Sequence, residues 1–168
     1  MNQSRKVINK ALGIIEIILG ISVIITTIYS WKIVLTQYEH FGVSWERISL
    51  LKLFKQAHFV FLSGLMGLVS GILLIKRKRW GWITSVSSLL IYSIGLILIA
   101  MGVNNNGKLL LEDQGDYISI GTILALFLIL AFLLVIKPIR DFYNIKTRDW
   151  AIIGTIVILF TLDKLIIN

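Results

Sequence analysis

The hydrophobic pattern of the chain consists of five long apolar runs, separated by polar segments that hold most of the charged residues. The runs cover residues 11–29, 59–75, 82–101, 118–136 and 150–167. Strict alternation of polar and apolar residues is absent from them, which argues against the strands of a membrane barrel. A helix crosses the hydrocarbon core with about 20 apolar residues. The pattern therefore predicts an all-α, polytopic integral membrane bundle with five transmembrane helices, forming a single domain over residues 1–168.

The second and third runs flank a short basic segment that begins with four consecutive cations, Lys76–Arg79. This arrangement predicts a transmembrane hairpin whose turn lies in water on the positively charged side. The fifth run is uninterrupted only as far as Leu162, because Asp163 and Lys164 follow. A lysine near a helix end can extend its ammonium group to the interface. We therefore expect residues 150–167 to span the membrane as well.

The polar segment between the first two runs contains a predicted amphipathic helix over residues 44–57, with Ser44 as its N-cap. Its apolar face includes Leu50 and Phe54, and its polar face includes Lys52 and Lys55. Such a helix is typical of the headgroup region, where it would lie flat and lead into the second span. The alternative is one long helix that projects out of the membrane.

Small residues recur at intervals of four and seven within the runs and predict the faces by which the helices pack. Lipid tails are as apolar as leucine, so helices in a membrane associate through close backbone approach and polar contacts. A spacing of seven suits a left-handed crossing near about +20°. We expect ordinary helix packing from these residues, and not a lined pore. The predicted packing seam comprises Gly13, Gly20, Ser63, Gly64, Gly67, Gly71, Gly81, Gly95 and Gly102.

The chain has a net charge of +8, with 17 Lys and Arg residues against 9 Asp and Glu residues. Because these cations lie beside apolar spans, they indicate membrane topology and contact with anionic lipid headgroups at basic inner loops, and no nucleic-acid partner is expected. Eleven of the 17 lie in the N-terminal segment and in the connectors 76–79 and 137–148. Short cytoplasmic segments carry such an excess, which predicts a cytoplasmic N-terminus and an external C-terminus. Five tryptophans fall at predicted interfaces: Trp31, Trp45, Trp80, Trp82 and Trp150.

The sequence contains no residue set that is typical of an enzyme. The zinc-peptidase HExxH, the nucleophile-elbow GxSxG and a phosphate-binding loop are all absent. Without cysteine there is no disulfide, thiolate metal site or thiol redox chemistry. His40 and His58 fall on the same predicted outer side, where two axial haem ligands are conceivable but interfacial histidines are far commoner. We therefore expect no cofactor and no metal.

Glu16 is the one acidic residue deep within a predicted span. It shares a helix stripe with Gly13 and Gly20, so it should face the bundle, and no Lys or Arg lies at its depth. Its carboxyl is therefore expected to be protonated or cation-bound near neutral pH. It could form a proton, cation or polar-substrate site, or it could be a hydrogen-bonded acid that fixes helix register. We favour the second interpretation, because polar residues often join membrane helices. The candidate polar site comprises Glu16, Ser70, Ser85, Ser88, Tyr92 and Thr155.

These patterns favour a non-enzymatic membrane protein: a subunit, scaffold or effector of a membrane complex, oligomeric with itself or with partner membrane proteins. The alternative is a transporter or channel component that uses the polar site around Glu16. A lipid-modifying or redox enzyme is a third class, for which the catalytic residues are missing. The abundance of Ile, Leu, Lys and Asn is typical of a bacterium with AT-rich DNA, so we expect the chain in a bacterial inner membrane.

Overall fold

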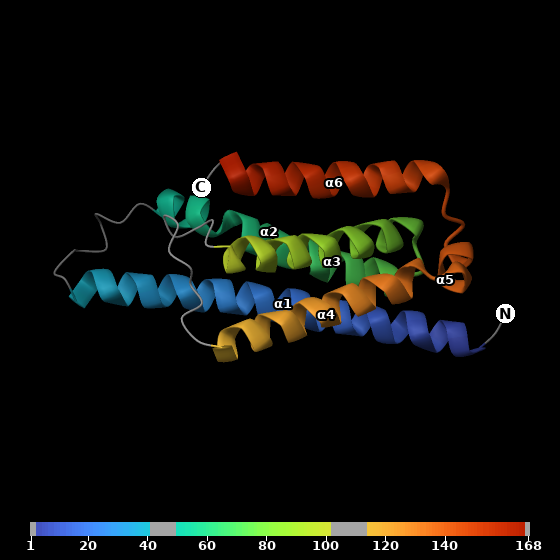
Figure 1. Cartoon of the computed structure of the whole chain (residues 1–168), viewed down its shortest axis with the longest axis horizontal. Helices are drawn as coiled ribbons and strands as arrows, with labels where there is room; N and C mark the ends of the chain where they lie inside the picture. Colours follow the sequence, from blue (N-terminus) through green and yellow to red (C-terminus); the bar gives the residue numbers. More distant parts are fainter. Residues whose placement is uncertain (1–2, 41–49, 102–113, 167–168) are drawn as a thin grey trace.

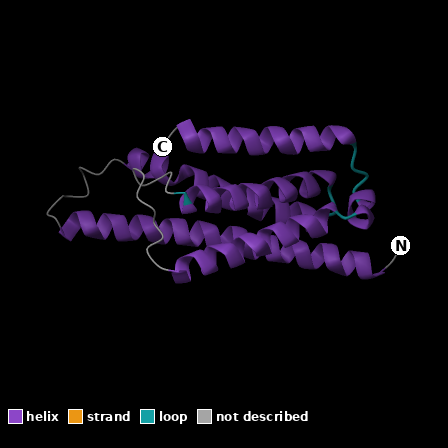
Figure 2. Ribbon diagram, in the orientation of Figure 1, coloured by secondary structure: helices purple, strands orange, loops and turns teal. Residues whose placement is uncertain are grey.

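The computed structural model describes residues 3–40, 50–101 and 114–166, and this part of the chain is helical apart from short turns (Figure 2). The helices are α1 (Gln3–His40), α2 (Leu50–Ile75), α3 (Arg79–Ala100), α4 (Gln114–Val135), α5 (Lys137–Phe142) and α6 (Thr147–Ile166). The five long helices lie side by side, and the short α5 lies between α4 and α6 at one end (Figure 1). We call this end, where α1 begins, the N-terminal end of the bundle, and the opposite end, where α6 finishes, the C-terminal end.

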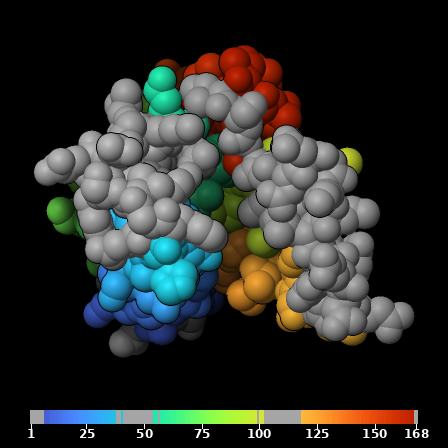
Figure 3. Space-filling view, turned by 90° about the vertical axis from the view of Figure 1, so that its left-hand side faces the viewer, coloured from blue at the N-terminus to red at the C-terminus, as the bar shows by residue number. Residues whose placement is uncertain are grey.

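α3 is the central helix of the bundle. It packs against α2, α4 and α6, whereas α1 packs mainly against α2. Seen from the C-terminal end, α1, α4 and α6 occupy three separate sides of the molecule (Figure 3). Within the apolar window of α3, 67% is buried, against 22% for α4. α3 can be surrounded in this way because it has small or apolar residues on every face, with no charged residue after Arg79.

Four helices are long and apolar enough to cross a membrane, over Val7–Gln37, Ala57–Ile75, Arg79–Leu98 and Ile118–Val135. The predicted spans 11–29, 59–75, 82–101 and 118–136 coincide with these segments to within a few residues, except that the first segment is much longer. Several long apolar helices are thus compatible with a membrane location. α6 covers the fifth run but does not reach the same apolar composition, because it contains Asp149, Asp163 and Lys164.

α1 continues well beyond the predicted end of the first span at Tyr29. Its 38 residues correspond to about 57 Å at 1.5 Å per residue, about twice the thickness of the hydrocarbon core. Between Tyr29 and His40 there is no glycine or proline to stop the helix. Ser30 and Thr36 instead donate hydrogen bonds to carbonyls one turn earlier, at 2.9 and 3.0 Å. These polar residues after Tyr29 are therefore accommodated within the helix.

The predicted interfacial helix over 44–57 has a different form in the part that the structure describes. From Leu50 onward it is continuous with the second span in the single helix α2, as the alternative of one long helix predicts. Residues 44–49 lie outside the described residues. Phe54 packs against Trp31 of α1 and Phe61 of α2, with ring centroids 6.4 and 6.2 Å apart. This aromatic cluster joins α2 to the extended end of α1 and favours one straight helix over a turn into the membrane surface.

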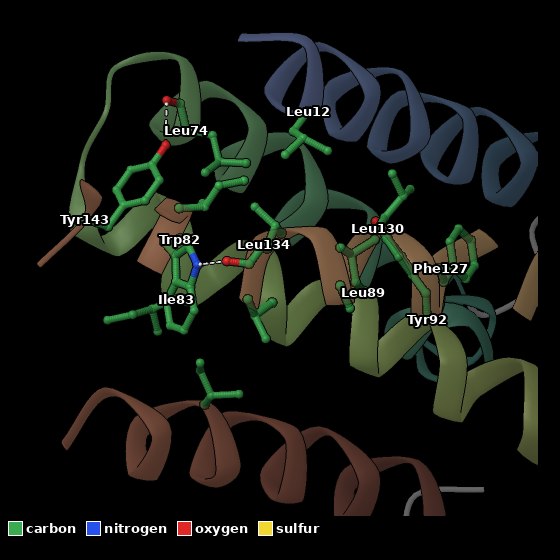
Figure 4. Close-up of a cluster of buried hydrophobic side chains, with 14 residues drawn as sticks. Leu12, Leu74, Trp82, Ile83, Leu89, Tyr92, Phe127, Leu130, Leu134 and Tyr143 are labelled. Atoms are coloured by element: carbon green, nitrogen blue, oxygen red, sulfur yellow. Dashed lines mark hydrogen bonds between the residues drawn. The ribbon is translucent and has the colours of Figure 1, made fainter. Parts of the chain in front are cut away.

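Trp82 is fully buried, at 0% exposure, and so is not the interfacial anchor that its position in the sequence suggests. Its indole N–H donates a 2.8 Å hydrogen bond to the carbonyl of Leu134, in the last turn of α4 (Figure 4). That carbonyl lacks a normal helical partner, because α4 ends at Val135 and the residue four positions on, Pro138, has no N–H. The ring also packs edge-on against Trp150 of α6, at 5.3 Å. Trp82 therefore holds α4 and α6 on α3.

Candidate intramembrane polar site

Glu16 lies at the junction of three helices and is only 3% exposed. Ser70 of α2 donates a hydrogen bond to one oxygen of its carboxyl group, and Ser85 of α3 donates one to the other. Both donors lie in predicted spans at the depth at which the sequence placed Glu16. The carboxyl group therefore joins α1, α2 and α3 through hydroxyl groups alone.

Glycines allow α1 to approach α2 closely enough for these bonds to form. A Cβ atom added at Gly13 would lie 2.8 Å from the carbonyl oxygen of Gly71, and one at Gly20 would lie 2.7 Å from that of Gly64. One added at Gly71 would lie 2.5 Å from the carbonyl oxygen of Gly13. Because these neighbours are backbone atoms, no side-chain rotation could make room. Glu16 lies between Gly13 and Gly20 on this contact, which explains its burial.

The other seam residues belong mainly to the contact between α2 and α3. Gly67 faces the hydroxyl of Tyr92, which donates a 2.9 Å hydrogen bond to the carbonyl of Ser63. A Cβ atom at Gly81 would lie 2.5 Å from the backbone of Leu74. Gly95 is less crowded, because its nearest neighbour is the Phe59 ring, at 3.2 Å. Gly102 lies outside the described residues.

The remaining candidates for the polar site do not contact Glu16. Ser88 is buried one turn from Ser85, and its hydroxyl bonds to the Ser85 carbonyl at 2.9 Å. Tyr92 lies a further turn along α3. Thr155 is exposed and bonds to Ala151 within α6. α6 packs on a different side of α3 from α1 (Figures 1 and 3), so the structure does not bring Thr155 to Glu16.

Chemically, this site is a carboxyl group whose two oxygens are both engaged. Hydroxyl donors from Ser70 and Ser85 occupy them, and a cation that bound the carboxyl group would have to displace at least one of these bonds. Among the described residues there is no group of three or more His, Asp and Glu side chains that could hold a metal ion. The geometry thus suits a tie between helices more directly than a coordination site.

Asn9 of α1, which is not among the predicted site residues, is only 2% exposed. Neither its side-chain oxygen nor its nitrogen has a hydrogen-bond partner among the described residues. Asn9 precedes Glu16 by seven residues and therefore lies on the same helix stripe. That spacing of seven residues is the sequence signal that could have identified Asn9. It extends the line of buried polar side chains of α1 towards the N-terminal end of the bundle.

A second missed feature is the ion pair between Arg79 of α3 and Asp149 of α6. Two hydrogen bonds connect them, of 2.5 Å from Nη2 and 3.0 Å from Nε. Asp149 also accepts the backbone N–H of Lys146 at 2.8 Å, as the third residue of a helix does in a capping box. Burial by itself raises the pKa of Asp149, but these hydrogen bonds and the charges of Arg79 and Arg148 together hold it below the ordinary value of 3.8. The pair therefore fixes the start of α6 on α3.

Asp149→Asn is expected to lower the free energy of unfolding by about 2 kcal/mol near neutral pH, because Arg79 loses its charged partner. A depressed folded pKa gives stability that is present above the unfolded value and is lost as the pH falls through the folded value. The difference in the free energy of unfolding between wild type and Asp149→Asn should therefore shrink as the pH falls. Melting temperatures in detergent, measured from neutral pH down to about pH 2, test this.

The matched control for this experiment is Asp141→Asn, at an exposed position on α5. It should leave the melting temperature nearly unchanged at every pH, since exposed side chains contribute little. A difference between wild type and Asp149→Asn that persists undiminished at the lowest pH would contradict a charged role for Asp149.

Tyr143, in the turn after α5, is a further buried polar group at the N-terminal end. Its hydroxyl lies 3.4 Å from the carbonyl of Leu74 and donates to it (Figure 4). Burial raises its pKa to about 12; the charge of Arg77 opposes the shift and that of Glu16 adds to it. Tyr143 therefore stays neutral and connects the segment after α5 to the end of α2.

No protein-family model, curated protein or solved structure matches the chain. What the molecule does has to be inferred from the contacts of Glu16, from the packing of the helices and from the groups at the two ends of the bundle.

Proposed function

We propose that the chain is a non-enzymatic integral membrane protein that acts as a subunit or scaffold, in assembly with further copies of itself or with other membrane proteins. The observation that carries this proposal is the hydrogen bonding of the Glu16 carboxyl group. The one acid deep in the spans has both carboxyl oxygens bonded to hydroxyl groups of neighbouring helices. Its contacts suit the fixing of helix register, because polar side chains join membrane helices by hydrogen bonds between them.

In the topology that we propose, α6 is the fifth span and the two termini lie on opposite sides of a cell membrane. α6 has 20 residues, enough for about 30 Å. Three of its four charged residues contact a residue of α2 or α3. Asp149 pairs with Arg79, Asp163 contacts His58, and the Lys164 ammonium lies 5.6 Å from the centre of the Phe59 ring. Charged groups in membranes are typically paired in this way.

The orientation that we propose places the N-terminal end of the bundle in the cytoplasm, where its cations meet anionic headgroups. Exposed cations gather there, at Lys10, Lys76, Arg77, Lys78, Lys137 and Lys146. Basic segments beside a span are attracted to anionic lipids by about 1 kcal/mol per cation. A reporter that is active only in the cytoplasm should therefore be silent when fused to Asn168. Strong activity of that fusion would contradict either the fifth span or the orientation.

Purification in mild detergent, followed by native mass spectrometry, tests the proposed assembly role. We expect a homo-oligomer, or a complex with another membrane protein at fixed stoichiometry. An isolated monomer, obtained both in detergent and in lipid nanodiscs, would contradict the proposal.

Transport of a proton or cation at Glu16 is the second candidate function. It is favoured by the line of buried polar side chains that continues from Glu16 through Ser88 to Tyr92 on α3. The two functions differ in what they require of the carboxyl group. A tie between helices needs hydrogen-bond acceptors, whereas transport needs a group that can bind and release a cation.

Glu16→Gln separates these functions. The amide can keep a bond to each serine, because a hydroxyl group can accept as well as donate. We expect the variant to keep its assembly and to change the free energy of unfolding by less than about 1 kcal/mol. Ion flux should be measured in liposomes for wild type and variant. Flux in the wild type that the variant abolishes, with assembly intact, would replace the scaffold role by transport.

A matched control is Thr155→Val, at the exposed candidate residue on α6. It should alter neither assembly nor flux, because Thr155 does not contact Glu16.

A further inference from the structure

His58, on α2 near the C-terminal end of the bundle, is buried between two hydrogen-bond acceptors. Its Nδ1 lies 2.5 Å from the carbonyl oxygen of Lys55, and its Nε2 lies 2.7 Å from Oδ2 of Asp163 on α6. The carbonyl can only accept, so Nδ1 must donate its N–H there. A neutral imidazole then has a bare lone pair at Nε2. Contact with Asp163 therefore requires one further proton, either on Nε2 or on the carboxyl group.

Among the residues that the structure describes, this contact is the polar link between α6 and α2. α6 packs chiefly against α3, and its contact with α2 is slight. The neighbouring contacts are apolar or weakly polar: Phe59 meets Phe160 with ring centroids 6.1 Å apart, and Lys164 lies over the Phe59 ring. Beside the pair is a groove of about 540 Å³, lined by Leu62, Leu159, Phe160, Leu162, Asp163 and Ile166. The groove thus runs along the C-terminal half of α6, where this helix faces α2.

We propose that His58 and Asp163 form a proton-binding site that holds the C-terminal half of α6 against α2. With the proton bound, the pair is neutral overall and makes a short hydrogen bond. Without it, the Nε2 lone pair faces a carboxylate, and the two groups repel each other. Loss of the proton therefore releases this half of α6 and widens the groove. The inference is independent of the scaffold role and of Glu16.

None of the other titratable side chains that the structure describes at this end of the bundle replaces the pair. On α6, Lys164 is adjacent to Asp163 and lies over the Phe59 ring. On α2, the Lys55 side chain is exposed. α3 contributes only Tyr92, whose hydroxyl is bonded to the Ser63 carbonyl. On α1, the described titratable side chains, Tyr29, Lys32 and His40, line a separate groove.

The chain contains no cysteine, so pairs of introduced cysteines can carry spin labels without background labelling. Leu65→Cys on α2 with Leu165→Cys on α6 reports on the C-terminal half of α6, at exposed positions outside the groove lining. Ile72→Cys with Ala151→Cys reports on the N-terminal half as a control. Distances should be measured in nanodiscs at about pH 5 and about pH 10, on either side of the ordinary histidine pKa. We expect the first distance to lengthen and broaden at the higher pH and the control distance to stay constant.

Two variants test whether the shared proton is responsible. His58→Phe keeps an apolar ring of similar size but removes the proton site, so the first distance should be long at both pH values. Asp163→Asn supplies an amide N–H that can donate to the bare Nε2 of neutral His58, so the distance should stay short at about pH 10. If the wild-type distance is the same at both pH values, if the control distance changes with it, or if Asp163→Asn opens as the wild type does, the proposal is overturned.

Discussion

Gly20→Ala is expected to lower the free energy of unfolding by about 3 kcal/mol, at the upper end of the usual range for overpacking. The added Cβ would lie 2.5 Å from the backbone nitrogen of Leu68 and 2.7 Å from the carbonyl oxygen of Gly64. Both are backbone atoms of α2, so the helices must separate to admit it. Separation would also weaken the bond from Ser70 to Glu16, four residues before Gly20. The measurement is thermal or denaturant unfolding in detergent.

Gly121→Ala is the matched control for this substitution, because nothing lies within 4 Å of a Cβ added there on α4. At a helix position with no neighbouring atoms, the same change should be neutral, or stabilising by up to about 1 kcal/mol, because alanine is the better helix former. Gly95→Ala should fall between the two, since it meets only the movable ring of Phe59 at 3.2 Å. Equal stability of Gly20→Ala and Gly121→Ala would show that α1 and α2 do not need this close approach.

Trp82→Phe is expected to lower the free energy of unfolding by about 2 kcal/mol. The phenyl ring keeps much of the apolar contact but removes the donor to the Leu134 carbonyl. That carbonyl would be left unpaired in the interior, at a cost of about 1–3 kcal/mol. Pro138 has no N–H with which to replace the lost donor. The end of α4 should therefore loosen, which hydrogen exchange of its last turn would detect.

Trp80→Phe provides the control, two residues away in the same helix. Trp80 is 56% exposed, so its replacement should change stability by less than about 0.5 kcal/mol. If Trp82→Phe is no more destabilising than Trp80→Phe, the bond to Leu134 does not hold α4 in place.

Which segments form helices could largely be predicted, and the reason lies in the solvent. In hydrocarbon every backbone N–H and C=O must be satisfied within the segment, so a charge-free run of sufficient length has to be a helix. The ends of the helices were harder to predict. The first span was predicted to end at Tyr29, with the apolar run, yet the helix continues, and the hydroxyls of Ser30 and Thr36 bond to carbonyls of the same helix. A polar residue ends a span without necessarily ending the helix.

The candidate site was predicted in part. Counting residues from the ends of the runs placed Ser70 and Ser85 at the depth of Glu16, and the structure brings these three together. The same count included Thr155, which points away from the bundle centre. It offered no reason to pair His58 with Asp163, which are 105 residues apart. It also placed Trp82 at an interface, because a count of depth does not show that α4 and α6 cover it.

The sequence by itself thus determined the position of each residue along its predicted helix, because that position follows from the length of each apolar run and the charges that end it. Only the tertiary structure decided which face of each helix meets which neighbour. A lipid tail is as apolar as a leucine side chain, so an apolar residue carries no signal of whether it faces lipid or protein. That choice is made by close backbone approach, as between Gly20 and Gly64, and by single polar contacts such as those of Glu16 and Trp82. Those contacts form only when several helices pack together.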